Sequence, residues 1–178
     1  MRNQLRSERL LLRQWRDADR LPFRQLNADL RVMEFFPEPL AAPASDALFD
    51  RAREHFSLHG FGLFAVELVE SSAFVGFAGL SIPAFNAHFM PAVEIGWRLA
   101  FEHWGKGLAT EGARAALGFG FNDLGFEQVV SFTVPANLRS RRVMEKLGMT
   151  HDPADDFDHP KLPEGHPLRR HVLYRINR

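Results

Sequence analysis

A carboxylate, a glycine loop and an Asn-x-x-Ser sequence supply the chemistry that this chain is expected to perform. Glu94 is a candidate general base, because a carboxylate accepts a proton when its pKa suits the task. The Gly-Lys-Gly sequence at 105–107 gives a backbone that can turn sharply and approach a ligand closely. Asn137 and Ser140 are three residues apart, so a helix carries both side chains on one face. The sequence therefore predicts a site that binds a ligand at the loop and moves a proton.

The glycine loop follows an expected strand and precedes an expected helix. Residues 92–99 alternate in polarity like a strand, and one apolar face is formed by Val93, Ile95, Trp97 and Leu99. From Leu108, apolar and small residues recur at four-residue spacing, which predicts an amphipathic helix to about residue 124. The first N–H groups of a helix are free and lie at the positive end of its dipole. The loop therefore predicts an anion site, most simply for a phosphate.

A glycine-rich turn without any ligand is one alternative, and two known phosphate loops are others. A nucleoside-triphosphate loop requires Ser or Thr after Gly-Lys, and Gly107 stands at that position. A dinucleotide fingerprint requires a third glycine at a set spacing near the first strand, which this loop lacks. Both nucleotide interpretations fail. The plain turn and a phosphate loop of a different kind stay open.

Composition excludes several classes of protein. At 178 residues the chain is expected to form one domain, 1–178, with room for a substantial core. The net charge is zero, which gives no indication of nucleic-acid or anionic-membrane binding. No apolar run approaches the length of a membrane span. Cysteine is absent, which excludes disulfides and a cysteine nucleophile, and a cytoplasmic location is expected.

Periodicity and turn residues predict a mixed α/β chain. The expected strands are 9–15, 61–68, 73–82, 92–99, 128–134 and 170–176. The expected helices are 17–28, 45–59, 108–124 and 137–147, and a short helical piece is expected at 29–36. Asp17 and Ser45 are the expected N-caps of the first two helices. Gly76 and Gly79 within a strand predict a bulge or the close approach of a ligand. The loop at 83–91 is expected to cover a core edge rather than line a substrate site. The early strands form a hairpin, so a mostly antiparallel sheet is expected.

The sequence Trp104-Gly105-Lys106-Gly107-Leu108-Ala109 resembles the pyrophosphate loop of the GNAT superfamily of acyl-CoA N-acyltransferases, written Arg/Gln-x-x-Gly-x-Gly/Ala. Trp104 stands where Arg or Gln is usual, a departure typical of the RimJ/RimL-like branch. Three further segments resemble that branch in order, over residues 8 to about 150. They are the opening strand Glu-Arg-Leu-Leu-Leu-Arg at 8–13, the central strand Glu-Ile-Gly-Trp at 94–97, and a second CoA motif at 137–148.

The resemblance implies a GNAT-like α/β fold and an acetyl-CoA-dependent N-acetyltransferase. Its twisted, mostly antiparallel mixed sheet would have about six or seven strands flanked by helices and be splayed at the acyl-CoA site. The acceptor would be a protein N-terminal amine, of the ribosomal-protein type, or a small-molecule amine, attacking directly in a ternary complex. A homodimer is compatible with the family. The cofactor-binding residues implied are Trp97, Arg98, Leu99, Trp104, Gly105, Lys106, Gly107, Leu108, Ala109, Thr110, Asn137 and Arg142.

The resemblance also assigns catalytic roles, each with a simpler alternative. Glu94 would be the base, acting through a water; alternatively it pairs with Arg98 and both are exposed. Backbone N–H groups of 97–99 would bind the thioester oxygen where a bulge breaks the ladder. Ser140 would protonate the leaving thiolate and Asn137 bind the pantetheine arm; alternatively Asn137 only caps a helix. The sole tyrosine, Tyr174, lies near the C-terminus, away from the usual position of the acid.

The C-terminal region carries acidic and histidine residues that suggest a role in choosing the substrate. An acidic lip attracting a cationic amine is one interpretation, and a solvated loop is the other. The residues concerned are Asp155, Asp156, Asp158 and His159. His159 or His171 is also a candidate base. The spacing fits no metal motif, so no metal is expected. A catalytically silent CoA-binding sensor or scaffold, and a nucleotide-binding regulatory module, are the rival functions.

Overall fold

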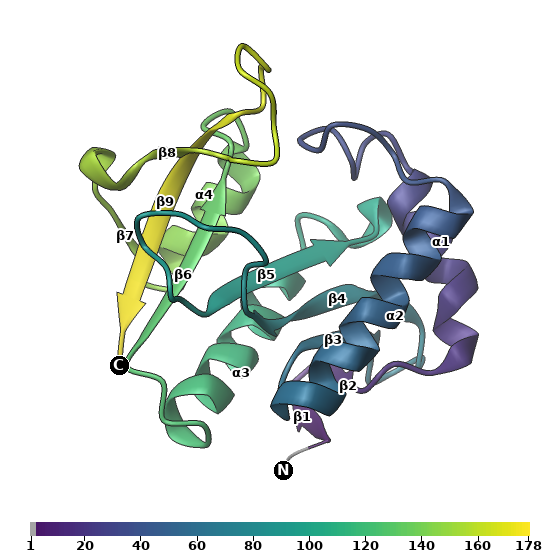
Figure 1. Ribbon diagram of the computed structural model, residues 1–178. Helices are drawn as coiled ribbons and strands as arrows, with labels where there is room; N and C mark the ends of the chain where they lie inside the picture. Colours follow the sequence, from purple (N-terminus) through teal and green to yellow (C-terminus); the bar gives the residue numbers. More distant parts are fainter. Residues whose placement is uncertain (1–2) are drawn as a thin grey trace.

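A twisted sheet with helices on both faces organises the computed structural model, which describes residues 3–178 (Figure 1). The strands are β1 (Gln4–Arg6), β2 (Leu10–Arg13), β3 (Leu63–Leu68), β4 (Phe74–Ser81), β5 (Glu94–Leu99), β6 (Gln128–Thr133), β7 (Thr150–His151), β8 (Phe157–Asp158) and β9 (Arg170–Asn177). The α-helices are α1 (Arg20–Ala28), α2 (Ala42–His59), α3 (Leu108–Asn122) and α4 (Leu138–Lys146). Short 3-10 helices span Asp17–Asp19, Phe101–His103 and Pro153–Asp155.

The strand order is β1-β2-β3-β4-β5-β6-β9-β7, with β8 also paired to β9. Within the described residues, β5 and β6 form the one parallel pair and the other neighbours are antiparallel. The expected mixed, mostly antiparallel sheet is thus confirmed. Nine strands are described, against the six or seven expected. The additional β1, β7 and β8 have two or three residues each, too few to show an alternating pattern.

The expected splay lies between β5 and β6. Their register is a single pair, Glu94 with Val130. The Val130 N–H donates to the Val93 carbonyl at 2.9 Å, and the Ser131 hydroxyl then reaches the Ile95 carbonyl at 2.9 Å. No further β5–β6 pair is formed among the described residues, and the strands diverge beyond this point. The side chains and helix ends around this gap form the site described below.

Two apolar layers enclose the sheet. On one face α3 packs against the β4 and β5 side chains, with Leu80, Ile95 and Ala116 fully buried. On the other face α1 and α2 pack through Phe23 and Phe49, around Trp15. This second layer carries helices and a loop that reach the open end of the sheet (Figure 1). The fold therefore places α1 and α2 on one side of the gap and α3 and α4 on the other.

A buried ion-paired group joins the second layer to the sheet. The Arg13 guanidinium contacts Asp19 at 2.7 Å and Glu67 at 2.6 Å, and all three side chains are buried. The Arg16 backbone N–H donates to the same Asp19 carboxylate at 2.7 Å. Buried charges are tolerated only when they are paired and hydrogen-bonded, and here both conditions are met. The group fixes the start of α1 against β2 and β3.

Several local expectations are wrong. Residues 29–36 form turns rather than a helical piece. Asp17 starts a 3-10 helix instead of capping an α-helix. Ser45 lies inside α2, which begins at Ala42, and its buried hydroxyl accepts a hydrogen bond from Asn27 at 2.9 Å. In these segments a tertiary contact or a turn limited by proline outweighed the local helix preference of the sequence.

The glycines within β4 serve strand packing. A Cβ at Gly76 would lie 2.1 Å from the Arg98 carbonyl oxygen, and one at Gly79 would lie 2.2 Å from the Gly62 carbonyl oxygen. The close approach is therefore that of neighbouring backbone, not of a ligand. The expected bulge is present beside Gly76, because the β3–β4 register passes from Gly76 to Phe74 and leaves Val75 without a partner on β3. In the loop at 83–91, Phe89 is buried beside Phe157, which confirms that this loop covers a core edge. Across the described residues, no helix is long and apolar enough to cross a membrane.

Candidate active site

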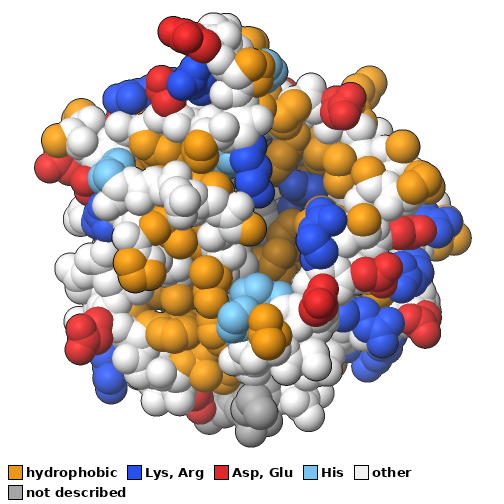
Figure 2. All heavy atoms as spheres, in the orientation of Figure 1, with side chains coloured by type: hydrophobic (Ala, Val, Ile, Leu, Met, Phe, Trp, Pro, Cys, Tyr) orange, Lys and Arg blue, Asp and Glu red, His pale blue; other side chains and the backbone are white. Residues whose placement is uncertain are grey.

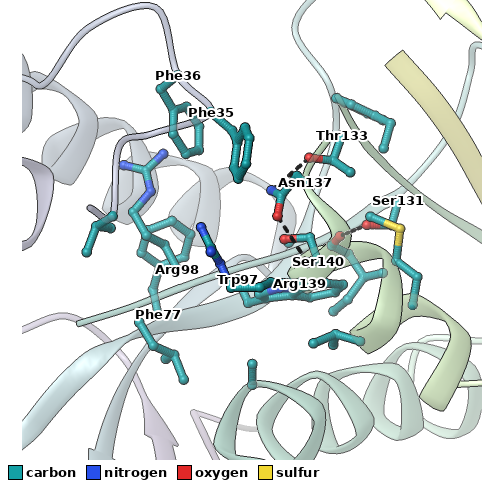
Figure 3. A pocket seen from close by; sticks show the side chains of 18 of the residues that line it. Phe35, Phe36, Phe77, Trp97, Arg98, Ser131, Thr133, Asn137, Arg139 and Ser140 are labelled. Carbon is teal, nitrogen blue, oxygen red and sulfur yellow. Dashed lines mark hydrogen bonds between the residues drawn. The ribbon is translucent and has the colours of Figure 1, made fainter. Parts of the chain in front are cut away.

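A cavity of about 770 Å³ occupies the gap between the diverging strands. Figure 2 shows it as a hollow with Lys and Arg side chains at its edge and apolar side chains inside. One part, here called the phosphate end, lies between the N-termini of α3 and α4. The other part, the aromatic end, lies under the connection between α1 and α2. The aromatic end is lined by Val32, Phe35, Phe36, Pro37, Phe77 and Arg98 (Figure 3).

The phosphate end is built on the glycine loop. Gly107 has a φ of 78° and immediately precedes α3, a left-handed conformation that glycine adopts without strain. The first backbone hydrogen bond of α3 runs from the Glu111 N–H to the Gly107 carbonyl. The N–H groups of 108–110 therefore have no partner within the helix and lie at the positive end of its dipole. This arrangement can hold a phosphate.

Arg9 braces the same loop, a role that the sequence analysis did not assign. Its guanidinium contacts Glu111 at 2.6 Å and donates to the Lys106 carbonyl at 2.9 Å. The Arg9 N–H and the Ser7 hydroxyl donate to the Glu111 carboxylate at 2.8 and 2.7 Å. The first turn of α3 is thus tied to the β1–β2 turn. The sequence feature that could have indicated this role is the Glu8-Arg9 pair at the start of the strand motif at 8–13.

Trp104, which stands where the resembled motif usually has Arg or Gln, joins the loop to β5. Its indole N–H donates to the Leu99 carbonyl at 2.7 Å. The Arg139 guanidinium lies 4.7 Å from the centre of its ring. Both residues line the cavity. The indole therefore fixes the loop and carries a cation over the phosphate end.

Most of the expected cofactor residues line the cavity, and Lys106 does not. Those that do are Trp97, Arg98, Leu99, Trp104, Gly105, Gly107, Leu108, Ala109, Thr110, Asn137 and Arg142. Lys146, at the end of α4, adds a further cation to the lining. The phosphate end therefore combines free helix N–H groups with basic side chains, the pairing that anionic ligands require.

The open donors of β5 come from strand divergence, not from the bulge that was expected. The β4–β5 register is continuous, and the irregularity in this sheet lies at Val66/Glu67 between β3 and β4. Because Ala100 donates to Val75 on β4, alternation directs the Arg98 N–H to β4 as well. The N–H groups of Trp97 and Leu99 point the opposite way, to the open edge. These two donors face the gap.

Glu94 lines the cavity and is the β5 member of the one β5–β6 register pair. Burial raises the pKa of its carboxyl to about 8, and no charged neighbour opposes that effect. The side chain keeps some accessible surface because it faces the cavity. It forms no ion pair with Arg98 or with any other described residue, so the alternative of an exposed Glu94–Arg98 pair is wrong. A carboxyl with a pKa near neutrality suits proton transfer.

Arg98 was expected at the cofactor, but its side chain lies in the aromatic end. One Nη donates to the Asn27 side chain of α1, and the guanidinium lies 4.0 Å from the centre of the Phe36 ring. Its Nε is buried without a hydrogen-bond partner. Burial lowers the pKa of this guanidinium to about 10. Figure 3 shows Arg98 directed toward Phe36, away from Ser140 and Asn137.

Asn137 and Ser140 lie together at the start of α4, where the motif placed them. The Asn137 side chain accepts the Ser140 N–H at 3.1 Å and donates to the Thr133 hydroxyl at 3.0 Å. Asn137 is therefore a helix N-cap, and it also lines the cavity with Ser140 (Figure 3). Tyr174 lies outside the cavity lining: its hydroxyl donates to Glu145 at 3.3 Å.

The expected acidic lip does not form. Asp155 pairs with Arg175 at 2.7 Å, and Asp156 contacts His151 at 2.7 Å. Asp158 lies 3.5 Å from Arg169 and is also near Arg170. None of the three carboxylates lines the cavity. All three carboxylates are engaged within the protein, Asp155 and Asp158 by arginines on or next to β9 and Asp156 by His151 of β7.

His159 does reach the cavity, together with His171. Their ring centres are 5.1 Å apart, and the rings of Phe85, Phe132 and Phe157 lie beside them. Burial, then the neighbouring His171 and Lys161, lowers the pKa of His159 to about 4, and burial also lowers that of His171. Both rings are therefore neutral at pH 7. Within 3–178, no group of three or more His, Cys, Asp or Glu side chains is placed to hold a metal ion.

Comparisons with known proteins agree with this geometry. A family model described as an acetyltransferase (GNAT) domain matches residues 9–150. The crystal structure of an acetyltransferase from Agrobacterium tumefaciens str. C58 has a TM-score of 0.80 at 28% identity, covering 100% of this chain and 96% of that chain. YnaD, an uncharacterised N-acetyltransferase of Bacillus subtilis (strain 168), is 26% identical over 170 residues, 96% of this chain and 94% of its own.

A second relative in Bacillus subtilis (strain 168), the uncharacterised protein YkkB, matches more closely over a shorter stretch. It is 37% identical over 91 residues, so the match spans about half of each protein, 51% of this chain and 52% of YkkB. The family model, by contrast, extends from the first strand motif to the end of the second CoA motif. With most of its length matched and a splayed sheet around a phosphate-binding helix, the protein belongs to the GNAT acetyltransferase family, a family of N-acyltransferases.

Proposed function

We propose that this protein transfers an acetyl group from acetyl-CoA to a primary amine by direct attack in a ternary complex. One observation carries the proposal. The same cavity holds the free N–H groups at the start of α3 and the buried carboxyl of Glu94. A diphosphate site and a proton acceptor in one enclosed space are what acyl transfer from CoA to an amine requires.

The residues present fit acetyl-CoA, which supplies an activated thioester. Gly107 and the N–H groups of 108–110 would hold the diphosphate, with Arg142 and Lys146 supplying positive charge. The Trp97 N–H faces the open edge of β5 and would donate to the thioester oxygen. A cavity of about 770 Å³ is large enough for a cofactor arm and a small acceptor.

Glu94 would act on the acceptor amine. An alkylammonium ion has a pKa of about 10.4 and is not nucleophilic, so a proton must leave before attack. Glu94 accepts that proton directly or through a water, since its pKa of about 8 lies close to working pH. The amine nitrogen forms the new C–N bond, the C–S bond breaks, and the sulfur keeps the electron pair of that bond.

Ser140 would assist the leaving sulfur by donating a hydrogen bond. Its N–H donates to the Asn137 side chain, and its hydroxyl belongs to the cavity lining and makes no hydrogen bond to another described residue. Tyr174 is engaged with Glu145 and Arg141 outside the cavity, so it is not placed for this role. Ser140, Asn137 and Trp104 together support assignment to the RimJ/RimL-like branch.

Two measurements test the proposal. Thermal unfolding with acetyl-CoA, CoA, ATP and NAD should show stabilisation by the first two alone. Thiol release from acetyl-CoA should then occur with at least one member of an amine and peptide panel. Binding of CoA without thiol release for any acceptor would favour the rival function, a catalytically silent CoA sensor. Stabilisation by ATP or NAD instead would contradict the acetyltransferase proposal.

A further inference from the structure

Arg98 is a partly buried cation whose Nε is fully buried, and it has no counter-ion among residues 3–178. Its Nε has no hydrogen-bond partner, one Nη bonds to the neutral Asn27 side chain, and no carboxylate contacts it. The Phe36 ring at 4.0 Å and the Phe77 ring at 5.4 Å offset only part of the lost hydration. An isolated buried charge is unfavourable until an opposite charge joins it. The guanidinium is therefore prepared for an anionic ligand.

The charges around the cavity favour the same ligand. Glu94 is the one carboxylate in the lining, within the described residues. Arg98, Arg139, Arg142, Lys146 and Lys161 also line it. Arg142 and Lys146 are taken up by the diphosphate in the proposed function, and Arg139 is paired with Glu34 of the α1–α2 connection, so Arg98 and Lys161 are the cations left for an acceptor. Such a cavity repels a polyamine, which would bring two or more positive charges, and attracts an acceptor that carries a negative group.

Gly96 leaves the path between Glu94 and Arg98 open. All three residues alternate onto the same face of β5. A Cβ at Gly96 would meet only the Glu94 carboxylate, at 4.0 Å, so the strand surface between the two charged side chains is free space. The Cα atoms of Glu94 and Arg98 are about 13 Å apart, from the rise of a strand. One extended small molecule can lie along this face and reach both.

The walls on this path are apolar. Phe35, Phe36 and Phe77 line the aromatic end (Figure 3), and Leu63 also lines the cavity. Such walls suit a ligand with a hydrocarbon segment between two polar ends. Glu94 and Arg98 would contact the polar ends, and the apolar walls would contact the hydrocarbon segment.

We propose that the acceptor is a small primary amine that also carries a carboxylate, with the amine at Glu94 and the carboxylate on Arg98. This inference rests on the proposed acetyltransferase function.

The test uses three acceptors that share one chain and differ at the far end: 6-aminohexanoate, 6-aminohexanamide and 1,6-diaminohexane. Initial rates of thiol release from acetyl-CoA give kcat/KM for each. The wild-type protein should prefer the carboxylate over the amide by about tenfold or more, because a charge-assisted pair to arginine replaces a neutral contact. The diamine should be the poorest acceptor. Arg98→Met should abolish the preference while the KM for acetyl-CoA stays unchanged.

Equal use of all three acceptors by the wild-type protein would overturn the inference and leave the acetyltransferase proposal standing. A uniform loss for all three in Arg98→Met would also overturn it, since the residue would then be merely structural. If none is acetylated, binding decides: calorimetry with CoA present should show hexanoate binding and hexanamide not binding. Failure of hexanoate to bind would overturn the inference, whereas failure of CoA to bind would overturn the function itself.

A second variant tests the path without touching either charge. Gly96→Ala places a methyl group in open space, so the fold should tolerate it. It should raise the KM for 6-aminohexanoate at least about threefold and leave the KM for acetyl-CoA unchanged. Gly118→Ala is the matched control, because that glycine faces open space on α3 outside the cavity. An unchanged acceptor KM in Gly96→Ala would contradict the placement along β5.

Discussion

Glu94 and Arg98 lie on one face of β5, carry opposite charges when ionised, and do not pair with one another. Burial therefore shifts both toward the neutral state, raising the pKa of the acid and lowering that of the base. Had the two paired, each would have stabilised the charge of the other and neither would be free for a ligand. Their separation by the open surface at Gly96 keeps both available.

The first prediction concerns the pH dependence of turnover. A general base must be ionised, so kcat/KM should rise with pH through about 8, the pKa of Glu94. Glu94→Gln should lower kcat by about 10²-fold or more and leave acetyl-CoA affinity nearly intact, because the base acts on the amine. The loss should diminish as pH rises and more free amine is present. A variant profile that overlays the wild-type profile would show that Glu94 is not the base.

The same residue should make stability depend on pH. Its pKa is about 8 in the folded protein and 4.5 in its ordinary state, so the folded protein favours the protonated form. The stability contributed by that protonation is complete below pH 4.5 and is lost as pH rises through about 8. Thermal unfolding should therefore show Glu94→Gln gaining stability relative to wild type across this window. A constant Tm difference from pH 5 to 9 would contradict the burial of this carboxyl.

At the phosphate end, Gly107→Val should weaken CoA binding at least about tenfold, roughly 1.4 kcal/mol. The substitution strains a φ of 78° and adds a branched side chain where the phosphate approaches the backbone. Gly125→Val is the matched control, because Gly125 has a φ of 72°, open surroundings and no place in the cavity lining. Calorimetry should find normal CoA affinity in the control. Equal affinities for the two folded variants would exclude Gly107 from the site.

Ser140→Ala should reduce kcat by about tenfold, less than Glu94→Gln, because a thiolate with a pKa of about 8.5 already leaves readily. Tyr174→Phe should leave kcat near the wild-type value. It removes the hydroxyl bonded to Glu145 and Arg141, so its effect should be about 1 kcal/mol of stability instead. Steady-state kinetics and unfolding of both variants separate the two roles. An inactive Tyr174→Phe beside an active Ser140→Ala would reverse the assignment.

Arg13 should prove important to stability and irrelevant to binding. Arg13→Met leaves buried Asp19 without a cation and Glu67 with only the exposed Arg16 at 3.6 Å, which should lower the free energy of unfolding by about 3–5 kcal/mol. Arg53→Met, which breaks an exposed ion pair with Asp17, should change it by about 0–1 kcal/mol. Denaturant unfolding measures both. Similar values for the two variants would mean that the buried group is not stabilising.

The parts of the fold predicted well from sequence are those whose signal is local and repeated. The β5 alternation, the helix after Gly107 and the Asn137 cap each depend on neighbours along the chain, and each lies where it was expected. The acidic residues at 155–158 were misread because the arginines that neutralise them, such as Arg175, lie on a strand distant in sequence. An ion pair between residues distant in sequence cannot be detected from the residue pattern of one segment.

The aromatic end shows the same limit more clearly. Phe36 and Arg98 are distant in sequence, and the segment 29–36 that carries Phe36 was expected to be a short helical piece. The alternation of β5 did place Arg98 beside Glu94 on one face. It did not show that Asn27 of α1 would hold the guanidinium over an aromatic ring. That contact depends on how α1 packs on the sheet, which side-chain patterns alone do not define.

The single β5–β6 register pair also makes the protein two lobes held together by few backbone bonds. One lobe carries β1 to β5, and the other carries β6 to β9 with α4 (Figure 1). The two lobes are therefore joined mainly by side-chain packing, since one apolar cluster runs from Ile95 of β5 to Val129 of β6 and Met144 of α4. A ligand that touches both lobes acts as a cross-link. Amide hydrogen exchange at the facing edges of the lobes should slow when CoA binds, far from any atom that the ligand itself covers.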